Sequence, residues 1–289
     1  MKRGWKIFWI VCGILIVFGI ACCAVGAAMG GNVASIKSDM FEQHKEISIV
    51  EENVIDVNPI VIPEESADDT TETEYKGIRK VDAEVSYIEL QVVEYEGETV
   101  KVQTSGISQE LLQDISCQSN GDELKIEQEH HKRWKQAFYN ADEDYGVMVI
   151  WVPENSLEEA DLSVGAGLLY VENIQAKELD VEVGAGKAIV ESFTTEHLSL
   201  QCGAGEAEIG GDAKQSEIEC GMGSVSYNAA GKETDYNYEL ECGVGSLNVG
   251  SMSLAGVASE KGLQNPGAAR QMDIQCELGS VDVTFNGEL

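Results

Sequence analysis

Apolar and polar residues alternate with a period of two through most of the chain from Ile78 onward. The clearest stretches are rich in β-branched residues and span 81–93, 100–104, 123–127 and 147–152. Because successive side chains of a strand point to opposite faces, this pattern predicts short β-strands. The stretch 130–145 interrupts the alternation with charges and aromatic rings, and it predicts a loop or a short helix.

A ten-residue motif recurs six times from Leu162 onward. The copies are LSVGAGLLYV, VEVGAGKAIV, LQCGAGEAEI, IECGMGSVSY, LECGVGSLNV and IQCELGSVDV. The first glycine of the pair falls at Gly165, Gly184, Gly203, Gly221 and Gly243, in steps of 19, 19, 18 and 22 residues. A short, fixed period indicates stacked units, and one such period at ~3.3 Å per residue makes two or three strands plus corners. The sequence therefore predicts an all-β fold, a single-stranded β-solenoid.

The apolar positions of each copy show which side chains face the interior. Before the glycine pair they lie three residues and one residue upstream, as at Leu200 and Cys202, and after it they lie at Ala207 and Ile209. The parity shifts by one residue across the pair, which is expected at a corner where the backbone needs angles open only to glycine. The predicted structural corners are Gly165, Gly167, Gly184, Gly186, Gly203, Gly205, Gly221, Gly223, Gly243, Gly245 and, in the last copy, Gly279.

Four cysteines occupy one inward position in the last four copies of the motif. These residues, Cys202, Cys220, Cys242 and Cys276, predict a buried column of thiols in successive coils about 4.8 Å apart. Parallel Cα–Cβ bonds are poor geometry for a disulfide, and the absence of CxxC spacing and of nearby His argues against zinc. Val164 and Val183 fill the same position in earlier copies, so we interpret these cysteines as small buried hydrophobes.

The first 36 residues differ in composition from the rest. Three basic residues within positions 2–6 precede an uncharged stretch whose most apolar part, residues 7–29, is long enough to span a bilayer as a helix. The basic flank would stay in the cytoplasm, which predicts a single-pass membrane protein with its C-terminal domain outside the cell. A signal peptide cleaved near the small residues 24–31 is an alternative, although its apolar core is usually shorter. A lipoprotein signal ending at Cys22 or Cys23 lacks the usual leucine three residues earlier.

The chain divides into three parts on this basis. Residues 1–36 are the predicted cytoplasmic tip and transmembrane anchor, 37–77 an acidic extracellular linker, and 78–289 the solenoid domain. Within the linker, PEESADDTTETE has no large apolar residue and predicts a solvated spacer, whereas the alternating residues 47–62 could form a short strand. Within the domain, residues 250–271 are rich in Gly, Ser and Ala and predict an insertion loop.

The charge limits the choice of partners. The whole chain carries a formal net charge of −32. Without the three basic residues of the anchor, 16 Lys and Arg face 51 Asp and Glu, a difference of −35. Such a charge argues against nucleic-acid or anionic-lipid binding by the folded part, so the predicted partners are the bilayer through residues 7–29 and an unidentified envelope protein or surface polymer.

Candidate chemistry is sparse. The Gly-x-Gly pairs continue into strands, whereas a dinucleotide fingerprint needs a third glycine and a following helix, and calcium-binding repeats need Gly-Gly-x-Gly-x-Asp every nine residues. Lys and Arg are rare along the repeats, and the four histidines form no Ser-His-Asp grouping. The sequence predicts no catalytic residue, cofactor or metal. An aromatic cluster, Trp134, Phe138 and Tyr139, is either a contact site for sugar or protein or a cap over an open solenoid end.

These features together resemble a known family. VDAEVSYIELQVVE from Val81, VMVIWVPEN from Val147, the VGAG and CGxG corners, and GSVDVTFNG near the C-terminus are similar to the putative adhesin domain of bacterial envelope proteins, domain of unknown function 4097 (DUF4097). The resemblance covers residues 78–289. It implies a β-solenoid at the cell surface and supplies no catalytic residue. Related domains also occur in proteins associated with envelope-stress sensing.

Three functions follow as hypotheses. The first is a non-enzymatic binding or structural module displayed on a membrane anchor. The second is an accessory component of a cell-envelope stress-sensing system, in which residues 1–36 would contact a membrane partner. The third is a carbohydrate-active β-helix enzyme, which would need a carboxylate pair in a groove with a basic neighbour.

Overall fold

The computed structural model describes residues 71–128, 146–255 and 258–287. In that part of the chain, no helix is long and apolar enough to cross a membrane. The predicted anchor, most of the predicted linker, and Trp134, Phe138 and Tyr139 lie outside the described residues.

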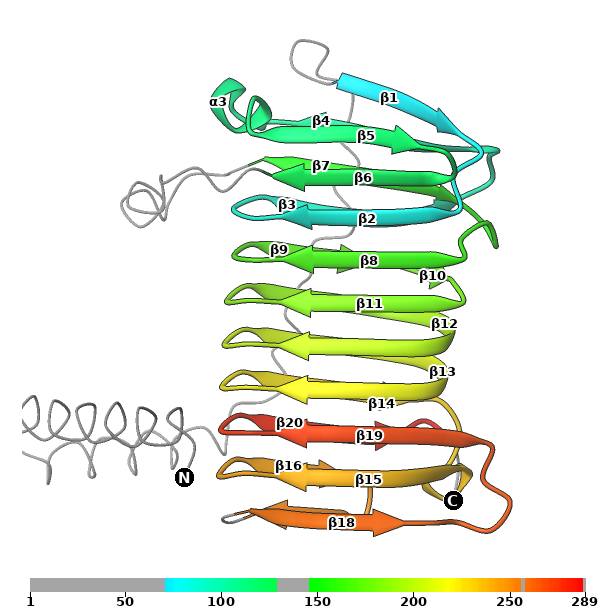
Figure 1. Cartoon of the computed structure of the whole chain (residues 1–289), viewed down its shortest axis with the longest axis vertical. Coiled ribbons are helices and arrows are strands. Elements are labelled where there is room, and N and C mark those ends of the chain that lie inside the picture. The colour runs from blue at the N-terminus through cyan, green and yellow to red at the C-terminus, as the bar shows by residue number, and fades with distance from the viewer. Residues whose placement is uncertain (1–70, 129–145, 256–257, 288–289) are drawn as a thin grey trace, which may run out of the picture. The chain divides into compact units, whose positions relative to one another are not determined.

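The described chain is a stack of β-coils, each with one strand in a front wall and one in a back wall (Figure 1). From one end of the stack to the other, the front wall contains β5 (Ile115–Asn120), β6 (Glu123–Gln128), β2 (Lys80–Val85), β8 (Glu159–Val164), β11 (Glu178–Val183), the second halves of β12 (Lys187–Cys202) and β13 (Glu206–Cys220), β19 (Arg270–Cys276), β15 (Tyr236–Cys242) and β18 (Ser259–Leu263).

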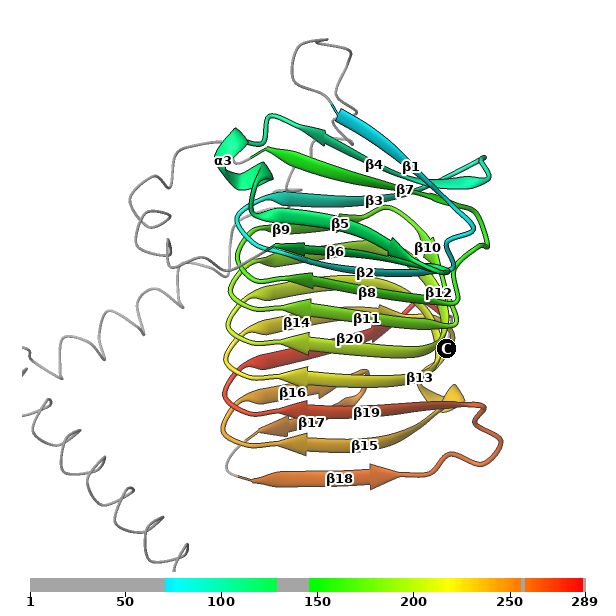
Figure 2. The same cartoon turned by 45° about the horizontal axis from the view of Figure 1, so that its top comes forward.

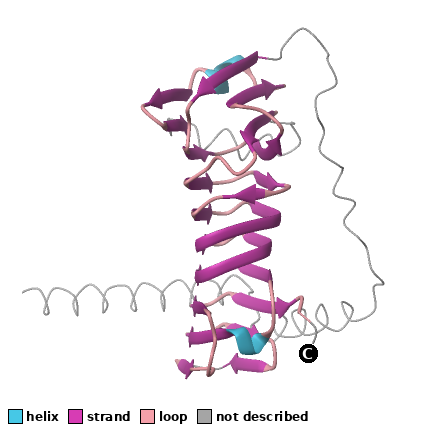
Figure 3. Ribbon diagram, turned by 90° about the vertical axis from the view of Figure 1, so that its right-hand side faces the viewer, coloured by secondary structure: helices cyan, strands magenta, loops and turns pink. Residues whose placement is uncertain are grey.

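The back wall contains β1 (Thr71–Lys76), β4 (Thr99–Ser105), β7 (Val147–Pro153), β3 (Glu89–Tyr95), β9 (Leu168–Val171), the first halves of β12 and β13, β14 (Ser224–Ala229), β20 (Ser280–Phe285), β16 (Ser246–Val249) and β17 (Met252–Ala255). The described residues also contain three short elements: β10 (Ile174–Gln175), the helix α3 (Gln109–Leu112) and the 3₁₀ turn η2 (Glu233–Asp235). Figure 3 shows the two walls in profile.

Neighbouring coils in the middle of the stack pair in parallel and in register. Val183 lies opposite Val164 on one side and Cys202 on the other, and Cys202 lies opposite Cys220. Inward residues therefore lie beside inward residues of the next coil, and outward residues beside outward ones, as the alternation in the sequence predicts. The inward side chains of both walls form one continuous hydrophobic core. Each coil has two main strands, and β12 and β13 continue through the bend between the walls.

The order of the coils differs from their order in the sequence. The last coil, β19–β20, lies between β13–β14 and β15–β16, because β19 pairs with both β13 and β15 and β20 pairs with both β14 and β16 (Figure 2). The first coil is interlaced in the same way, since β2–β3 lies between β6–β7 and β8–β9. The expectation that the cysteine-bearing copies stack in sequence order is therefore wrong for the last copy, and the first coil departs from sequence order as well.

Antiparallel strands close both ends of the stack. At one end β5 pairs with β6 and β1 with β4, and at the other β18 pairs with β15 and β17 with β16. This corrects two boundaries. Residues 71–76, assigned to the linker, form β1, whose Glu72 and Glu74 lie 3.5 and 3.3 Å from the ammonium of Lys101. The predicted insertion loop 250–271 contains β17 and β18 and the start of β19, because Met252 and Leu254 cover the end of the core.

Candidate functional site

The predicted corner glycines all lie in bends between a front strand and a back strand. The reason for glycine differs from the one expected. Of these eleven residues only Gly167 has a positive φ, 153°. The other ten are needed for close approach, since a β-carbon at Gly184 would lie 2.6 Å from the carbonyl oxygen of Gly165, and one at Gly203 would lie 2.9 Å from that of Gly184. Glycine at these corners therefore lets coils stack at sheet distance.

The four column cysteines are buried, each at most 2% exposed, and all four thiols are free. Because the last coil is interlaced, their order in the stack is Cys202, Cys220, Cys276, Cys242. The thiols interact with backbone carbonyls, as in the contact of Cys220 Sγ with the Gly223 oxygen at 3.3 Å. Among the described residues, no three His, Cys, Asp or Glu side chains are placed to hold a metal ion.

The outward side chains of the front wall form a continuous acidic surface. From β8 to β15 the carboxylates lie in rows across paired strands, and we call this set the acidic face. Its members are Glu159, Asp161, Glu178, Asp180, Glu182, Glu217, Glu219, Asp273, Glu239 and Glu241. Neutral polar residues separate some of them, as Gln201 separates Glu182 from Glu219. Neutral spacers lower the repulsion between like charges on neighbouring strands.

No lysine or arginine points outward within this acidic face. Arg270, at the start of β19, is turned to the far corner and donates to the Asp212 carboxylate at 2.9 Å. Lys80 contacts Glu159 at 2.5 Å and Lys125 contacts Asp82 at 3.2 Å in the first coils, and Lys177 and Lys214 pair with Glu158 and Glu196 where the front strands begin. Apart from Glu159, the members of the acidic face form no ion pair among the described residues, so their negative potential is left for solvent ions or a partner to balance.

Partial burial and the neighbouring carboxylates change the pKa of Asp161. It lies opposite Asp82 and Asp180 on the two neighbouring strands. Partial burial, followed by repulsion from these carboxylates and from Glu182 and Glu159, raises the pKa of Asp161 to about 6. Near neutral pH this carboxylate exchanges a proton readily, and a cationic partner would hold it in the charged form.

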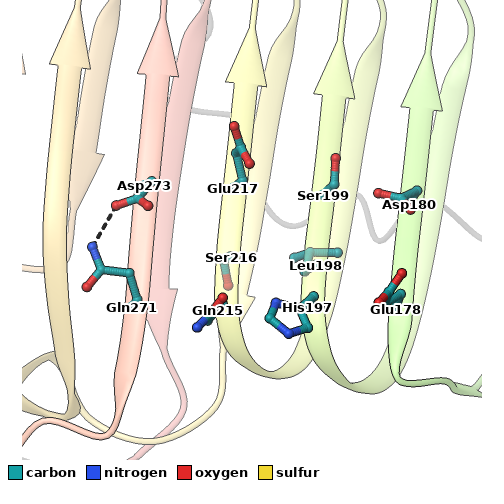
Figure 4. Close-up of a pocket in the computed structure, with 10 residues that line it drawn as sticks. All are labelled: Glu178, Asp180, His197, Leu198, Ser199, Gln215, Ser216, Glu217, Gln271 and Asp273. Carbon is teal, nitrogen blue, oxygen red and sulfur yellow. Dashed lines mark hydrogen bonds between the residues drawn. The ribbon is translucent and has the colours of Figure 1, made fainter. Parts of the chain in front are cut away.

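Two shallow hollows lie on the front wall. One, of about 180 Å³, is bordered by residues of four successive coils, including Glu178, His197, Glu217 and Asp273 (Figure 4). The other, of about 250 Å³, lies beside the glycine corners. Both are smaller than the roughly 300–1,000 Å³ of ordinary small-molecule sites. His197 stands opposite Glu178 and Gln215, and the Thr195 hydroxyl beside it donates to the His197 backbone oxygen at 2.9 Å. This surface suits contact with a macromolecule.

The two walls and the acidic face define an all-β, solenoid-like class of protein. The chain belongs to the Toastrack DUF4097 family, whose model matches residues 78–287. The family resemblance drawn from the corner motifs is therefore confirmed. No curated protein matches the chain.

The chain is also similar to several solved structures, all at low sequence identity. A putative adhesin from Bacteroides fragilis shares 14% identity, with 74% of this chain and 96% of that chain covered and a TM-score of 0.42. A putative cell adhesion protein from Clostridium sporogenes shares 13%, with 75% and 99% covered and a TM-score of 0.42. A putative lipid binding protein from Parabacteroides distasonis shares 15%, with 76% and 96% covered and a TM-score of 0.36.

Proposed function

We propose that this protein is a non-enzymatic binding or structural module displayed at the cell surface. In this proposal residues 7–29 span the membrane with the N-terminus in the cytoplasm, and the solenoid stands outside the cell. The acidic face contacts an envelope protein or a surface polymer. The observation that supports the proposal most strongly is the acidic face itself, ten outward carboxylates on the front wall from β8 to β15, interrupted only by the neutral row of β12.

The shape of the site favours binding over catalysis. Glycoside hydrolysis needs two carboxylates on opposite sides of a bound sugar, with separate protonation roles set by their surroundings. The carboxylates of the acidic face stand side by side on a flat wall, and neighbouring members such as Asp180 and Glu182 belong to the same strand. Such an array repeats one chemistry over many coils, which suits multivalent contact with an extended cationic partner.

The test compares cells that display the full chain with cells that lack it. Adhesion to immobilised envelope material is measured for the natural chain and for a variant with Glu178→Gln, Asp180→Asn, Glu217→Gln and Asp273→Asn. A control carries Glu154→Gln and Glu172→Gln, two exposed acids outside the acidic face. We expect the first variant to lose adhesion and the control to keep it. Equal adhesion by cells with and without the chain would refute the proposal, as would a solenoid that external protease reaches only after cell lysis.

A further inference from the structure

Three large hydrophobic side chains are highly exposed within the described part of the chain, and they lie side by side. Met222, Leu278 and Val244 are 67%, 59% and 62% exposed. The N–H of Leu278 donates to the Gly221 oxygen at 2.8 Å, and the N–H of Val244 donates to the Glu277 oxygen at 2.7 Å. The three residues therefore occupy successive coils on the glycine-corner edge.

Each of these residues is the middle member of a corner. In earlier coils the same position is alanine, at Ala185 and Ala204. We call the line Ala185, Ala204, Met222, Leu278 and Val244 the apolar ridge. Isolated apolar side chains are common on protein surfaces, but a contiguous line on an otherwise acidic molecule marks a contact surface. Because the last coil is interlaced, the ridge joins residues that are 56 and 34 positions apart in the sequence, at 222, 278 and 244.

The second hollow of the front wall runs directly beside this ridge. It holds about 250 Å³ and is lined by Glu182, Gln201, Glu219, Gln275 and Glu277, together with the corner backbone. Gly184, Gly203 and Gly221, which also line it, immediately precede ridge residues in the chain. No salt bridge to Glu182, Glu219 or Glu277 occurs among the described residues. An apolar line and an unpaired acidic groove thus form one continuous surface.

We propose that the ridge and groove bind a basic amphipathic helix of another polypeptide. This inference rests on the proposed function and names the class of partner and the surface. The spacing favours a helix. Three coils span about 9.6 Å, and two helical turns between residues i and i+7 span about 10.5 Å, whereas residues i and i+4 of a strand span about 13 Å. One helix face would cover Met222, Leu278 and Val244, and basic residues beside it would reach Glu219 and Glu277.

The charge argues against two other occupants of the ridge. A second copy would bring another strongly acidic face against the groove, which costs like-charge repulsion. An anionic membrane surface would be repelled in the same way, and the groove supplies no lysine or arginine to lipid headgroups. A cationic helix instead gains both apolar burial and charge complementarity.

The experiment uses the full chain in zwitterionic nanodiscs and a fluorescent peptide of leucine and lysine that forms an amphipathic helix. The comparison peptide has the same composition in scrambled order. Binding is followed by fluorescence anisotropy with empty nanodiscs as the blank. We expect the amphipathic peptide to bind at least about tenfold more tightly than the scrambled one. Equal binding of the two would overturn the proposal, since charge alone would then explain it.

Variants locate the site. We expect Met222→Ser with Leu278→Ser, and separately Glu219→Gln with Glu277→Gln, to weaken binding about tenfold, the second pair also flattening the salt dependence. The control pair Glu154→Gln with Glu172→Gln should bind within about twofold of the natural chain. Unchanged binding by both site variants refutes the proposal. It is also refuted if the main effect of the ridge variant is a lower mass in sedimentation than that of the natural chain, because the ridge would then be a self-association surface. Loss of peptide binding with normal cell adhesion would separate this inference from the proposed function.

Discussion

The Sγ atom of Cys220 lies directly beneath the second corner position of the interlaced coil, so that a β-carbon at Gly279 would be 2.7 Å from it. The same relationship joins Cys202 to Gly223 at 2.7 Å and Cys276 to Gly245 at 2.9 Å. Thiol and glycine are therefore complementary parts of one packing unit, in which a small inward side chain fills the space that the absent β-carbon leaves. Val183 plays the part of the thiol beneath Gly205 at 2.8 Å.

Substitution of a corner glycine should strongly destabilise the fold. We expect Gly279→Ala to lower the free energy of unfolding by about 2 kcal/mol or more, because the new methyl group meets both the Cys220 thiol and the backbone of Gly223. Gly262→Ala is the matched control, since a β-carbon there has only the Tyr238 oxygen, 3.9 Å away, within reach. Urea unfolding followed by circular dichroism measures both. A Gly279→Ala chain as stable as the control would show that the corner can relax.

Thiol reactivity should differ between the four buried column cysteines and Cys117, the other cysteine among the described residues. Cys117 is partly exposed on β5, whereas Cys202, Cys220, Cys242 and Cys276 are buried. We expect a thiol reagent to label Cys117 in the native protein and to reach the column only after unfolding, as read by peptide mass spectrometry. Rapid native labelling of Cys220 would mean that the interior opens locally far more often than its packing indicates.

Asp161 should make the free energy of unfolding depend on pH. Its folded pKa, about 6, lies above the ordinary value of 3.8, so the folded state binds the proton more tightly than the unfolded chain. The charged form of Asp161 destabilises the folded state. This destabilisation is fully present above pH 6 and is relieved as the pH falls toward 4 and the carboxylate is protonated. Asp161→Asn should therefore stabilise the protein by about 1 kcal/mol at pH 7, after allowance for solvent screening, and have little effect at pH 4. Thermal unfolding at the two pH values measures this, and equal effects at both would contradict it.

The interlaced last coil should be essential to the fold. Removal of residues 270–289 deletes a coil from between β13–β14 and β15–β16, which exposes two strand edges and part of the core. We expect loss of the cooperative unfolding transition. Replacement of residues 259–263 by Gly and Ser is the control, because β18 pairs with a single strand at the end of the stack. This replacement should lower the free energy of unfolding only in part. A truncated chain that still unfolds cooperatively would refute this coil order.

The coil itself could be predicted from the sequence, and the coil order could not. The period, the inward pairs such as Ile218 and Cys220, and the glycine corners all follow from local pattern. The pair Ile274 and Cys276, however, matches Ile218 and Cys220 as well as it matches Leu240 and Cys242, so the repeat does not reveal which neighbours the last coil takes. Sequence proximity favoured consecutive stacking, and tertiary packing placed the coil elsewhere.

The ends and the surface contacts were harder to predict for other reasons. β1 carries no apolar alternation and is held by edge pairing and by the contacts of Lys101 with Glu72 and Glu74, which composition does not reveal. The apolar ridge also escaped prediction, although its members stand between glycines in the repeat. Met222, Val244 and Leu278 were visible as larger residues at an alanine position, and only their adjacency in three dimensions makes them a surface.

Exchange of residues 1–36, the proposed anchor, tests most directly whether binding specificity resides in the surface of the solenoid. Residues 1–36 are replaced by an unrelated single-pass segment of the same orientation, and adhesion to envelope material is compared with that of the natural chain and of the acidic-face variant. We expect adhesion equal to that of the natural chain and well above that of the acidic-face variant. Loss of function on anchor exchange, with the solenoid still folded and displayed, would contradict it and place the specificity in the membrane segment, as an accessory role in envelope-stress sensing requires.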